Sequence, residues 1–202
     1  MDSNHWNKVY TNKSENEVSW FQEVPAKSLE LIEELNIKPN DCIIDIGGGD
    51  SRLVDHLLLK GFRNITILDI SAVALEKAKD RLQDKSQFIS YIVSDVTKFK
   101  PAQKYSLWHD RATFHFLTTS QQVESYLNIV NQCVAPGGFL IISTFSKTGP
   151  EKCSGLPIVQ YSDTDLKTLF EKYFTNIRCF EDTHKTPWDS VQNFVYCGFK
   201  KR

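Results

Sequence analysis

The feature that most constrains the fold is a short apolar run that ends in consecutive glycines. Residues Cys42–Ile46 are mainly apolar and are followed directly by Gly47–Gly49. Such a run is typical of a buried strand, a tight turn and the start of a helix. We expect Ser51 to cap that helix and Gly61 to end it. In a parallel sheet this arrangement places a ligand-binding crevice at the carboxyl end of the strand, where glycines let the backbone approach a ligand closely.

Further along the chain, short apolar segments alternate with amphipathic ones. The expected strands cover about Ile65–Asp69, Ser90–Val93, Tyr105–Trp108, Phe139–Ser143, Thr175–Glu181 and Val191–Lys200, and the expected helices run from about Pro25 to Leu35 and begin after Ser51, Ser71, Thr119 and Ser162. This alternation predicts an α/β fold with a doubly wound, mostly parallel sheet and helices on both faces. The last two strands are joined by a short polar loop, so we expect them to form an antiparallel hairpin at the sheet edge.

Composition excludes several classes of function. The formal net charge of the 202 residues is −1 and no basic tract is present, which argues against nucleic acid or a membrane surface as partner. The five cysteines are scattered without a C-x-x-C pair, so we expect a reducing compartment, no disulfide framework and no zinc or other metal site. Residues 1–17 lack the apolar core of a signal peptide, and no segment is long and apolar enough to span a bilayer, so we expect a cytoplasmic protein.

Acidic residues mark the ends of successive expected strands. Asp45, Asp69, Asp95 and Asp110 lie at or just past the carboxyl ends of four of them, and we expect all four to face the same crevice. Asp69 follows the glycines by about 20 residues, the spacing at which a carboxylate binds the hydroxyls of a ribose. The ligand is therefore expected to carry a ribose.

The glycine-rich loop argues against a dinucleotide. A G-x-G-x-x-G motif needs a glycine where this chain has Arg52. Asp45 and Asp50 flank the loop and add negative charge where a pyrophosphate would lie. A cationic nucleoside without phosphates, such as S-adenosylmethionine, fits better.

With these motifs in order, the sequence resembles the class I (seven-stranded) S-adenosylmethionine-dependent methyltransferases. The resemblance runs from about Pro25 to the C-terminus and rests on four motifs: Ile43–Ser51, Asp69, Ser94–Val96 and the turn Val134–Leu140. It implies the strand order 3-2-1-4-5-7-6 with the last strand antiparallel. It also implies a single domain over residues 1–202, with an N-terminal flap (1–24), a cofactor-binding half (25–145) and an acceptor-side lid, helix and hairpin (146–202).

The resemblance implies roles for particular residues. The methionine end of S-adenosylmethionine would be held by Asp45, Gly47, Gly48 and Gly49, and the ribose by Asp69. The face of the adenine would contact Ile70, and its edge would contact Asp95 and Val96. The chain departs from many members at Gly48, where another residue is common. S-adenosylhomocysteine would be the product.

The polar segment after the fourth strand is the candidate acceptor site. Asp110 is the first choice for contacting acceptor or cofactor and His109 the second. The alternative interpretation is structural: Asp110 pairs with Arg111 to hold the loop, and His115 is a satisfied core histidine. Methyl transfer needs a base only when the acceptor arrives protonated.

Large aromatic residues are unusual in a polar leader. Trp6, Tyr10 and Trp20 either pack back on the domain or cover the ligand, and with Arg111 and His115 they complete the expected acceptor-site residues. The aromatic pattern is similar to the start of several methyltransferase-like proteins that modify lysines of other proteins. Residues 146–161 are expected to form a lid with an exposed Cys153, and residues 184–188 to line the acceptor pocket.

The acceptor itself stays open: a small molecule or a protein side chain, including an amine such as lysine. Two alternative functions also remain, a nicotinamide-dependent oxidoreductase and a non-catalytic S-adenosylmethionine-binding protein.

Overall fold

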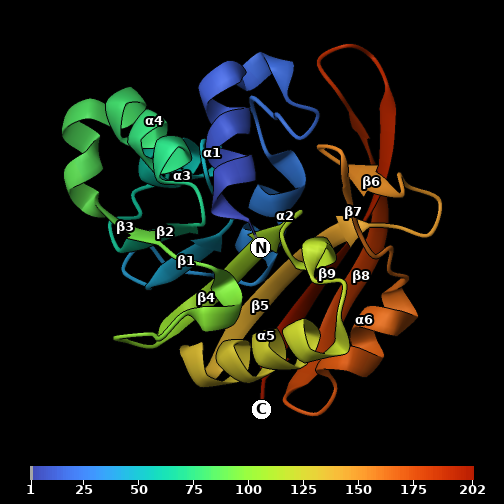
Figure 1. Ribbon diagram of the computed structural model, residues 1–202. Helices are drawn as coiled ribbons and strands as arrows, with labels where there is room; N and C mark the ends of the chain where they lie inside the picture. Colours follow the sequence, from blue (N-terminus) through green and yellow to red (C-terminus); the bar gives the residue numbers. More distant parts are fainter. Residues whose placement is uncertain (1) are drawn as a thin grey trace.

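A seven-stranded sheet forms the centre of the computed structural model, which describes residues 2–202 (Figure 1). Its strands are β1 (Ile43–Ile46), β2 (Ile65–Asp69), β3 (Ile89–Val93), β4 (Tyr105–Arg111), β5 (Val134–Phe145), β8 (Phe174–Lys185) and β9 (Val191–Lys201). They are arranged in the order β3-β2-β1-β4-β5-β9-β8. The first five are parallel, and β9 is antiparallel to both β5 and β8. Counted along the sheet's own strands, this is the order 3-2-1-4-5-7-6, which confirms the expected fold.

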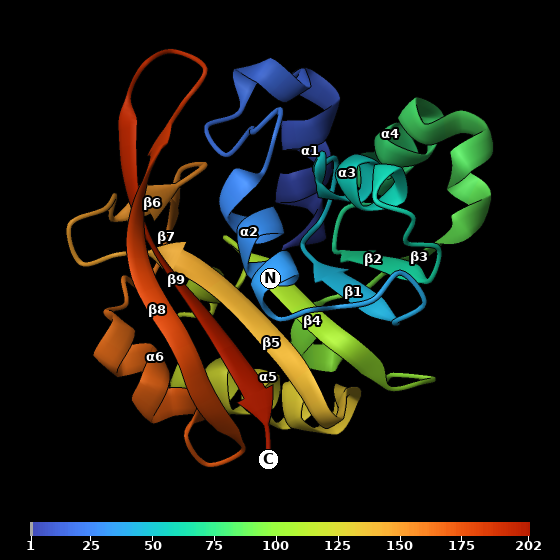
Figure 2. The same ribbon diagram turned by 180° about the vertical axis from the view of Figure 1, so that it is seen from behind.

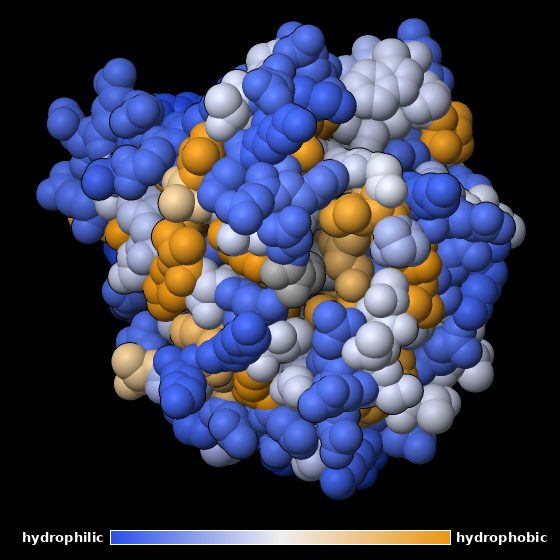
Figure 3. All heavy atoms as spheres, in the orientation of Figure 1, coloured by the Kyte–Doolittle hydropathy of each residue, from blue (hydrophilic) through white to orange (hydrophobic). Residues whose placement is uncertain are grey.

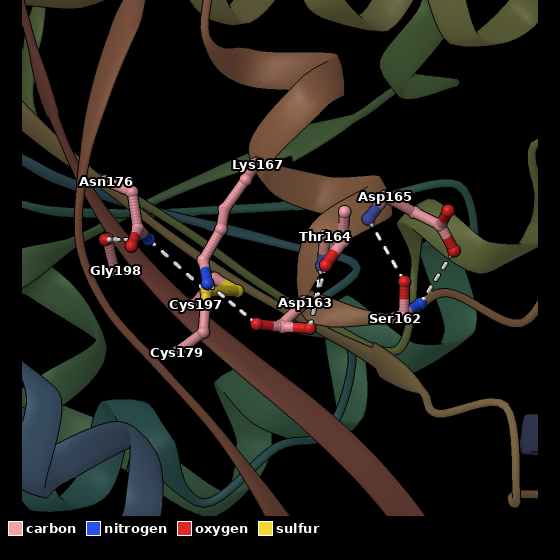
Figure 4. Close-up of a disulfide and its surroundings, with 9 residues drawn as sticks. All are labelled: Ser162, Asp163, Thr164, Asp165, Lys167, Asn176, Cys179, Cys197 and Gly198. Atoms are coloured by element: carbon pink, nitrogen blue, oxygen red, sulfur yellow. Dashed lines mark hydrogen bonds and ion pairs between the residues drawn. A yellow bond between two sulfur atoms is a disulfide. The ribbon is translucent and has the colours of Figure 1, made fainter.

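Helices cover both faces of the sheet. They are α1 (Ser3–Asn12), α2 (Ala26–Glu34), α3 (Leu53–Leu59), α4 (Ala72–Leu82), α5 (Ser120–Cys133) and α6 (Asp163–Phe170), with short 3-10 turns η1 (Glu15–Glu17), η2 (Gln83–Phe88), η3 (Val96–Lys98) and η4 (Phe114–Phe116). Ser71, Thr119 and Ser162 cap their helices as expected, and Figure 4 shows the reciprocal bonds between Ser162 and Asp165. Ser51 lies one residue before the N-cap of α3, where its hydroxyl accepts from the backbone N–H of Leu53 at 3.1 Å.

Alternation along the strands divides the core into two layers. Ile43, Leu107 and Ile141 pack with residues of α2 and α3 on one face. Their neighbours Ile44, Trp108 and Ile142 pack with residues of α5 and α6 on the other. Figures 1 and 2 show α5 and α6 together on one side of the sheet. Because side chains alternate between faces, the two faces of β4 carry different chemistry where the strand ends.

The N-terminal leader is helical rather than an extended polar stretch. Asp2 caps α1 by accepting from the backbone N–H of Asn4 at 2.9 Å. Trp6 and Tyr10 are four residues apart, so they lie on one face of the helix, and both are buried. In Figures 1 and 2, α1 lies between α4 and the β8–β9 hairpin, on the same side of the molecule as the small hairpin of β6 (Lys152–Cys153) and β7 (Leu156–Pro157).

One expectation from the cysteines is wrong. Cys179 on β8 and Cys197 on β9 lie directly opposite each other, with Cα atoms 4.2 Å apart, and are joined by a disulfide (Figure 4). Spacing along the chain does not reveal this pair, because it depends on the register of the hairpin. Cys42, Cys133 and Cys153 are free thiols.

The surface is mostly hydrophilic. Figure 3 shows hydrophilic side chains around the rim of one face and hydrophobic ones gathered nearer its centre. Within residues 2–202, no helix combines the length and the apolar character that a membrane crossing requires.

Candidate active site

Two adjoining clefts open beside the carboxyl ends of β1, β2 and β4. The first encloses about 690 Å³ of open space beside the glycine-rich loop, and the second about 580 Å³ beside β2. Tyr10, Trp20, Gly47 and Arg111 line both clefts, so the two are halves of one continuous site.

The glycine-rich loop turns sharply after β1. Gly47 and Gly49 have φ values of +62° and +47°, a region that favours glycine. A Cβ on Gly47 would lie 1.8 Å from Oγ1 of Thr113, and one on Gly48 would lie 2.6 Å from Oδ2 of Asp45. Side chains therefore crowd the loop from two directions, and only bare backbone fits between them.

Asp45 is held by a buried relay of side chains. Its Oδ1 lies 2.7 Å from Nδ1 of His109, and Nε2 of His109 lies 2.8 Å from Oγ of Ser28 on α2. All three residues are buried, and all three line the first cleft. The predicted residues Asp45 and His109 are thus brought together, and His109 is placed to orient the carboxylate.

Asp69 presents a carboxylate to the second cleft. Its side chain is only 5% exposed, and burial raises its pKa to about 7, with the nearby charge of Asp45 acting in the same direction. Oδ1 accepts from the backbone N–H of Ser71 at 2.7 Å. The hydroxyl of Tyr10 and Oδ2 of Asp69 converge on Gly49, 2.6 and 3.0 Å from where its Cβ would be.

The other residues expected at the cofactor lie beyond Asp69. Ile70, Ser94 and Val96 line the second cleft. The side chain of Asp95 caps η3 by accepting from the backbone N–H and the hydroxyl of Thr97, at 2.9 and 2.7 Å.

The N-terminal aromatics form part of the cleft wall. Trp6 packs edge-on against Trp20 and Phe116, with ring centroids 5.8 and 5.1 Å apart. Tyr10 also contacts Trp20 at 6.2 Å. The aromatics pack on the domain, as the first interpretation expects, and they also line the second cleft.

Arg111 projects from the end of β4 into the junction of the clefts. Its Nε donates to the hydroxyl of Tyr196 at 3.1 Å and its Nη1 to the backbone carbonyl of Trp20 at 3.0 Å. The guanidinium carbon lies 4.9 Å from the centroid of the Phe194 ring. The guanidinium is therefore fixed by neighbours on several sides.

Asp110 does not face the crevice, so the expectation that all four strand-end acids do so is wrong. It is fully buried and points toward α5, where its Oδ2 accepts from the hydroxyl of Tyr126 at 2.6 Å. Its Oδ1 accepts from the backbone N–H groups of Thr113 and Phe114. Burial raises its pKa to about 6. These contacts give Asp110 the loop-holding role of the alternative interpretation, through backbone groups rather than through Arg111.

His115 is likewise enclosed rather than exposed to the clefts. It is fully buried between Phe116 and Phe145, and burial lowers its pKa to about 3, helped by the charge of Arg111. Its Nδ1 lies 3.4 Å from the backbone nitrogen of Phe145, which donates to it. His115 is a neutral core histidine that supports the wall of the site.

Two expectations about the C-terminal third need correction. Cys153 is buried, not exposed, and burial raises its pKa to about 11, so it is an unreactive thiol that lines the second cleft. In the segment 184–188, His184 is buried and bonds to the carbonyl of Ser19 at 2.7 Å, whereas Trp188 is 53% exposed at the tip of the β8–β9 hairpin.

Sequence reasoning missed several residues of the site. Ser28 completes the relay through His109, and nothing in its helical neighbourhood marks it. Thr113 and Phe116 line the second cleft, and their position inside the polar segment after β4 could have identified them.

The fold is that of a doubly wound α/β protein with two joined clefts at the carboxyl ends of β1, β2 and β4. Residues 44–140 match the family described as "Methyltransferase domain". The resemblance of the sequence to the class I S-adenosylmethionine-dependent methyltransferases is thereby confirmed. The residues present fit the cofactor of this class, because the clefts offer a buried carboxylate, a bare glycine backbone and an apolar wall.

Relatives and solved structures agree with this assignment. The chain is 29% identical over 164 residues to malonyl-[acyl-carrier protein] O-methyltransferase 2 of Ilyobacter polytropus, covering 76% of this chain and 62% of that protein. It is 27% identical over 151 residues to the eEF1A lysine and N-terminal methyltransferase of Mus musculus, covering 70% of this chain but 21% of the relative. N-methyltransferase NodS from Bradyrhizobium japonicum WM9, solved with S-adenosyl-L-homocysteine, has the same fold, with a TM-score of 0.69 at 16% identity over 99% of both chains.

Proposed function

We propose that this chain is an active methyltransferase that binds its cofactor along Asp45, the glycine-rich loop and Asp69 and its acceptor beside Arg111. The observation that carries the proposal is the continuity of the two clefts, which places the glycine-rich loop, Asp69 and Arg111 around one space. In this arrangement residues 1–24 cover the cofactor, 25–145 hold it, and 146–202 contribute to the acceptor side.

S-adenosylmethionine, when bound, supplies a methyl group on a sulfonium: the acceptor's lone pair bonds to the methyl carbon while the carbon–sulfur bond breaks and its electron pair stays on sulfur. Asp45, oriented by His109, is proposed to hold the cofactor's amino group, and Asp69 the ribose hydroxyls. Ile70 and Val96 pack around the adenine, and Asp95 borders it.

No general base is proposed. Asp110 and His115, two titratable groups of the segment that ends and follows β4, are enclosed in the core, and His109 is occupied on both ring nitrogens. Catalysis then comes from holding the acceptor in line with the methyl group, and a proton carried by the acceptor passes to water.

The relatives offer two acceptor chemistries. One is named for malonyl-[acyl-carrier protein] and the other for a lysine and an N-terminus of eEF1A. The malonyl group is an acid, whereas a lysine or an N-terminus is an amine, so the charge of the side chains around the acceptor distinguishes these two kinds of substrate. This chain spans less than two thirds of the length of either relative, so the substrates of both are candidates for it and no more.

The alternative functions are less well supported. An oxidoreductase that binds a dinucleotide would need positive charge at the loop, but Arg52 is occupied by Glu15 through two hydrogen bonds. We propose a cytoplasmic location because three of the five cysteines are free thiols. The Cys179–Cys197 disulfide counts against this location, because disulfides are rare in a reducing compartment.

The test is calorimetric titration with S-adenosylmethionine, S-adenosylhomocysteine and NAD, followed by detection of S-adenosylhomocysteine released with candidate acids and amines. We expect saturable binding of the first two and none of NAD, with binding lost in Asp69→Ala and kept in the exposed control Asp84→Ala. Binding of NAD in preference to the sulfonium compound contradicts the proposal.

A further inference from the structure

The guanidinium of Arg111 has a donor that the protein leaves unused. Nε and Nη1 bond to Tyr196 and to the carbonyl of Trp20, but Nη2 is buried and has no hydrogen-bond partner among residues 2–202. A buried charged donor without a partner costs more free energy than a neutral one, so such groups are normally satisfied. Here the unused nitrogen belongs to a residue that lines both clefts.

Arg111 also lacks a carboxylate partner. Arg52, Arg81 and Arg178 each form ion pairs with acidic side chains. None of the ion pairs found within residues 2–202 includes Arg111. A cation in a partly buried position without a neighbouring anion is a site prepared for one.

The groups packed around this cation are neutral. Burial, opposed by the charge of Arg111, holds the pKa of Cys153 well above neutrality, so its thiol stays protonated. Burial, reinforced by the charge of Arg111, lowers the pKa of His115 and of His184, so both imidazoles stay uncharged. The charge of Arg111 is therefore not balanced by its immediate neighbours.

The cofactor's own carboxylate is the first anion to consider. The first cleft, which holds the glycine-rich loop, is also lined by Lys13 and by the loop backbone, whereas Arg52 in the same cleft is paired with Glu15. Arg111 lines both clefts, and its side chain contacts Phe194 and Tyr196, which lie in the segment 146–202 proposed for the acceptor side. On these contacts we assign its free donor to the acceptor rather than to the cofactor.

We propose that the methyl acceptor carries a carboxylate, which Arg111 binds through Nη2 beside the methyl group. This inference rests on the proposed function. A charge-assisted hydrogen bond is strong, and the apolar surroundings of Trp20 and Phe116 strengthen it. The same aromatic walls favour an acceptor with an apolar or planar body next to the carboxylate. A lysine side chain, being cationic, is disfavoured at this position.

Three probes with one skeleton test this assignment: 3-phenylpropanoate, its neutral amide and 3-phenylpropylamine. Each is titrated by calorimetry into the wild-type protein saturated with S-adenosylhomocysteine, and into Arg111→Gln, Arg111→Lys and the control Arg202→Gln. Arg202 is an exposed arginine at the C-terminus, so its replacement removes the same charge away from the clefts. The affinity of each variant for S-adenosylhomocysteine is measured first, which also shows that it is folded.

We expect the acid to bind the wild-type protein roughly 10- to 100-fold more tightly than the amide or the amine. Arg111→Gln abolishes this preference for the acid while leaving the affinity for S-adenosylhomocysteine within about twofold of wild type. Arg111→Lys keeps part of the preference for the acid, and Arg202→Gln keeps all of it.

Equal binding of acid and amide, no binding of the acid in the millimolar range, or an unchanged preference in Arg111→Gln overturns the inference. A large loss of S-adenosylhomocysteine affinity in folded Arg111→Gln also overturns it, because Arg111 then serves the cofactor's carboxylate. Failure of the wild-type protein to bind S-adenosylhomocysteine refutes the proposed function itself, before any probe is added.

Discussion

Replacing Asp69 by asparagine is expected to stabilise the free protein and to weaken cofactor binding. Burial raises the pKa of Asp69 from 3.8 to about 7, so its ionised form is disfavoured in the fold by about three pH units. That difference corresponds to an upper limit of about 4 kcal/mol. Asparagine has the same shape without the charge, and its oxygen still accepts from the N–H of Ser71, so we expect a net gain of about 1–3 kcal/mol at pH 8.

The effect has a definite pH dependence. Because the pKa of Asp69 is higher in the folded than in the unfolded protein, its contribution to stability is complete below the unfolded pKa and is lost as the pH rises through about 7. The advantage of Asp69→Asn is therefore largest at about pH 8 and falls to roughly two fifths of that at about pH 5, where the carboxyl is protonated in the folded protein but still mostly ionised in the unfolded one. Urea denaturation at both values measures this difference.

Cofactor binding should change in the opposite direction. The ionised carboxylate accepts charge-assisted hydrogen bonds from the ribose, so Asp69→Asn should lower the affinity for S-adenosylhomocysteine roughly 10- to 100-fold. In the wild-type protein the affinity should fall about tenfold between about pH 8 and about pH 6, as the carboxyl of pKa about 7 becomes protonated. The control is Asp84→Asn in η2, an exposed position at which we expect neither effect. A destabilised Asp69→Asn, or a stability gain that is the same at both pH values, would refute the reasoning.

Three further substitutions separate structural from binding roles. Asp110→Ala leaves the hydroxyl of Tyr126 and two backbone N–H groups without their acceptor, so it should lower the free energy of unfolding by about 3–5 kcal/mol in denaturation experiments. The protein that still folds should keep its affinity for S-adenosylhomocysteine. A lower affinity with unchanged stability would restore a binding role for Asp110. Gly47→Ala combines a positive φ with a contact of 1.8 Å to Thr113, whereas Gly155→Ala has a positive φ and no neighbour within 4 Å, so only the first should abolish cofactor binding. His109→Phe removes both bonds of the relay and should weaken S-adenosylhomocysteine binding roughly tenfold in calorimetry; equal affinity would show that Asp45 needs no orientation.

Most of the sheet could be predicted because its central strands are buried on both faces. The segment Ile65–Asp69, for example, is short, apolar and bounded by turn residues, and it is followed by a helix with a readable cap, Ser71. The glycine-rich loop and the spacing to Asp69 then located the cofactor half of the site. The helix α1 was missed because its apolar side consists of only Trp6 and Tyr10, too few for a clear periodic pattern.

The error at Asp110 has a geometric cause. The sequence indicated a strand that ended at Trp108, with the acidic residue in the loop beyond it, free to turn toward the crevice. In the structure β4 continues to Arg111, so His109 and Asp110 point to opposite faces of the sheet. Strand ends are the least certain part of such predictions, and here a shift of a few residues decides which side chain reaches the ligand.

The end of β4 organises the whole site through this alternation. His109 bonds to Asp45, and Arg111, two residues on, lies on the same face of the strand and lines both clefts. Asp110 between them points into the α5 layer and fastens the turn that follows, by accepting from the backbone N–H groups of Thr113 and Phe114. Ala112 makes this turn possible with a φ of +68°. The turn brings Thr113 against the carbonyl of Ile46, and with it against the glycine-rich loop. A buried acid therefore fastens the turn after β4, while the residues on either side of it in the sequence, His109 and Arg111, line the clefts.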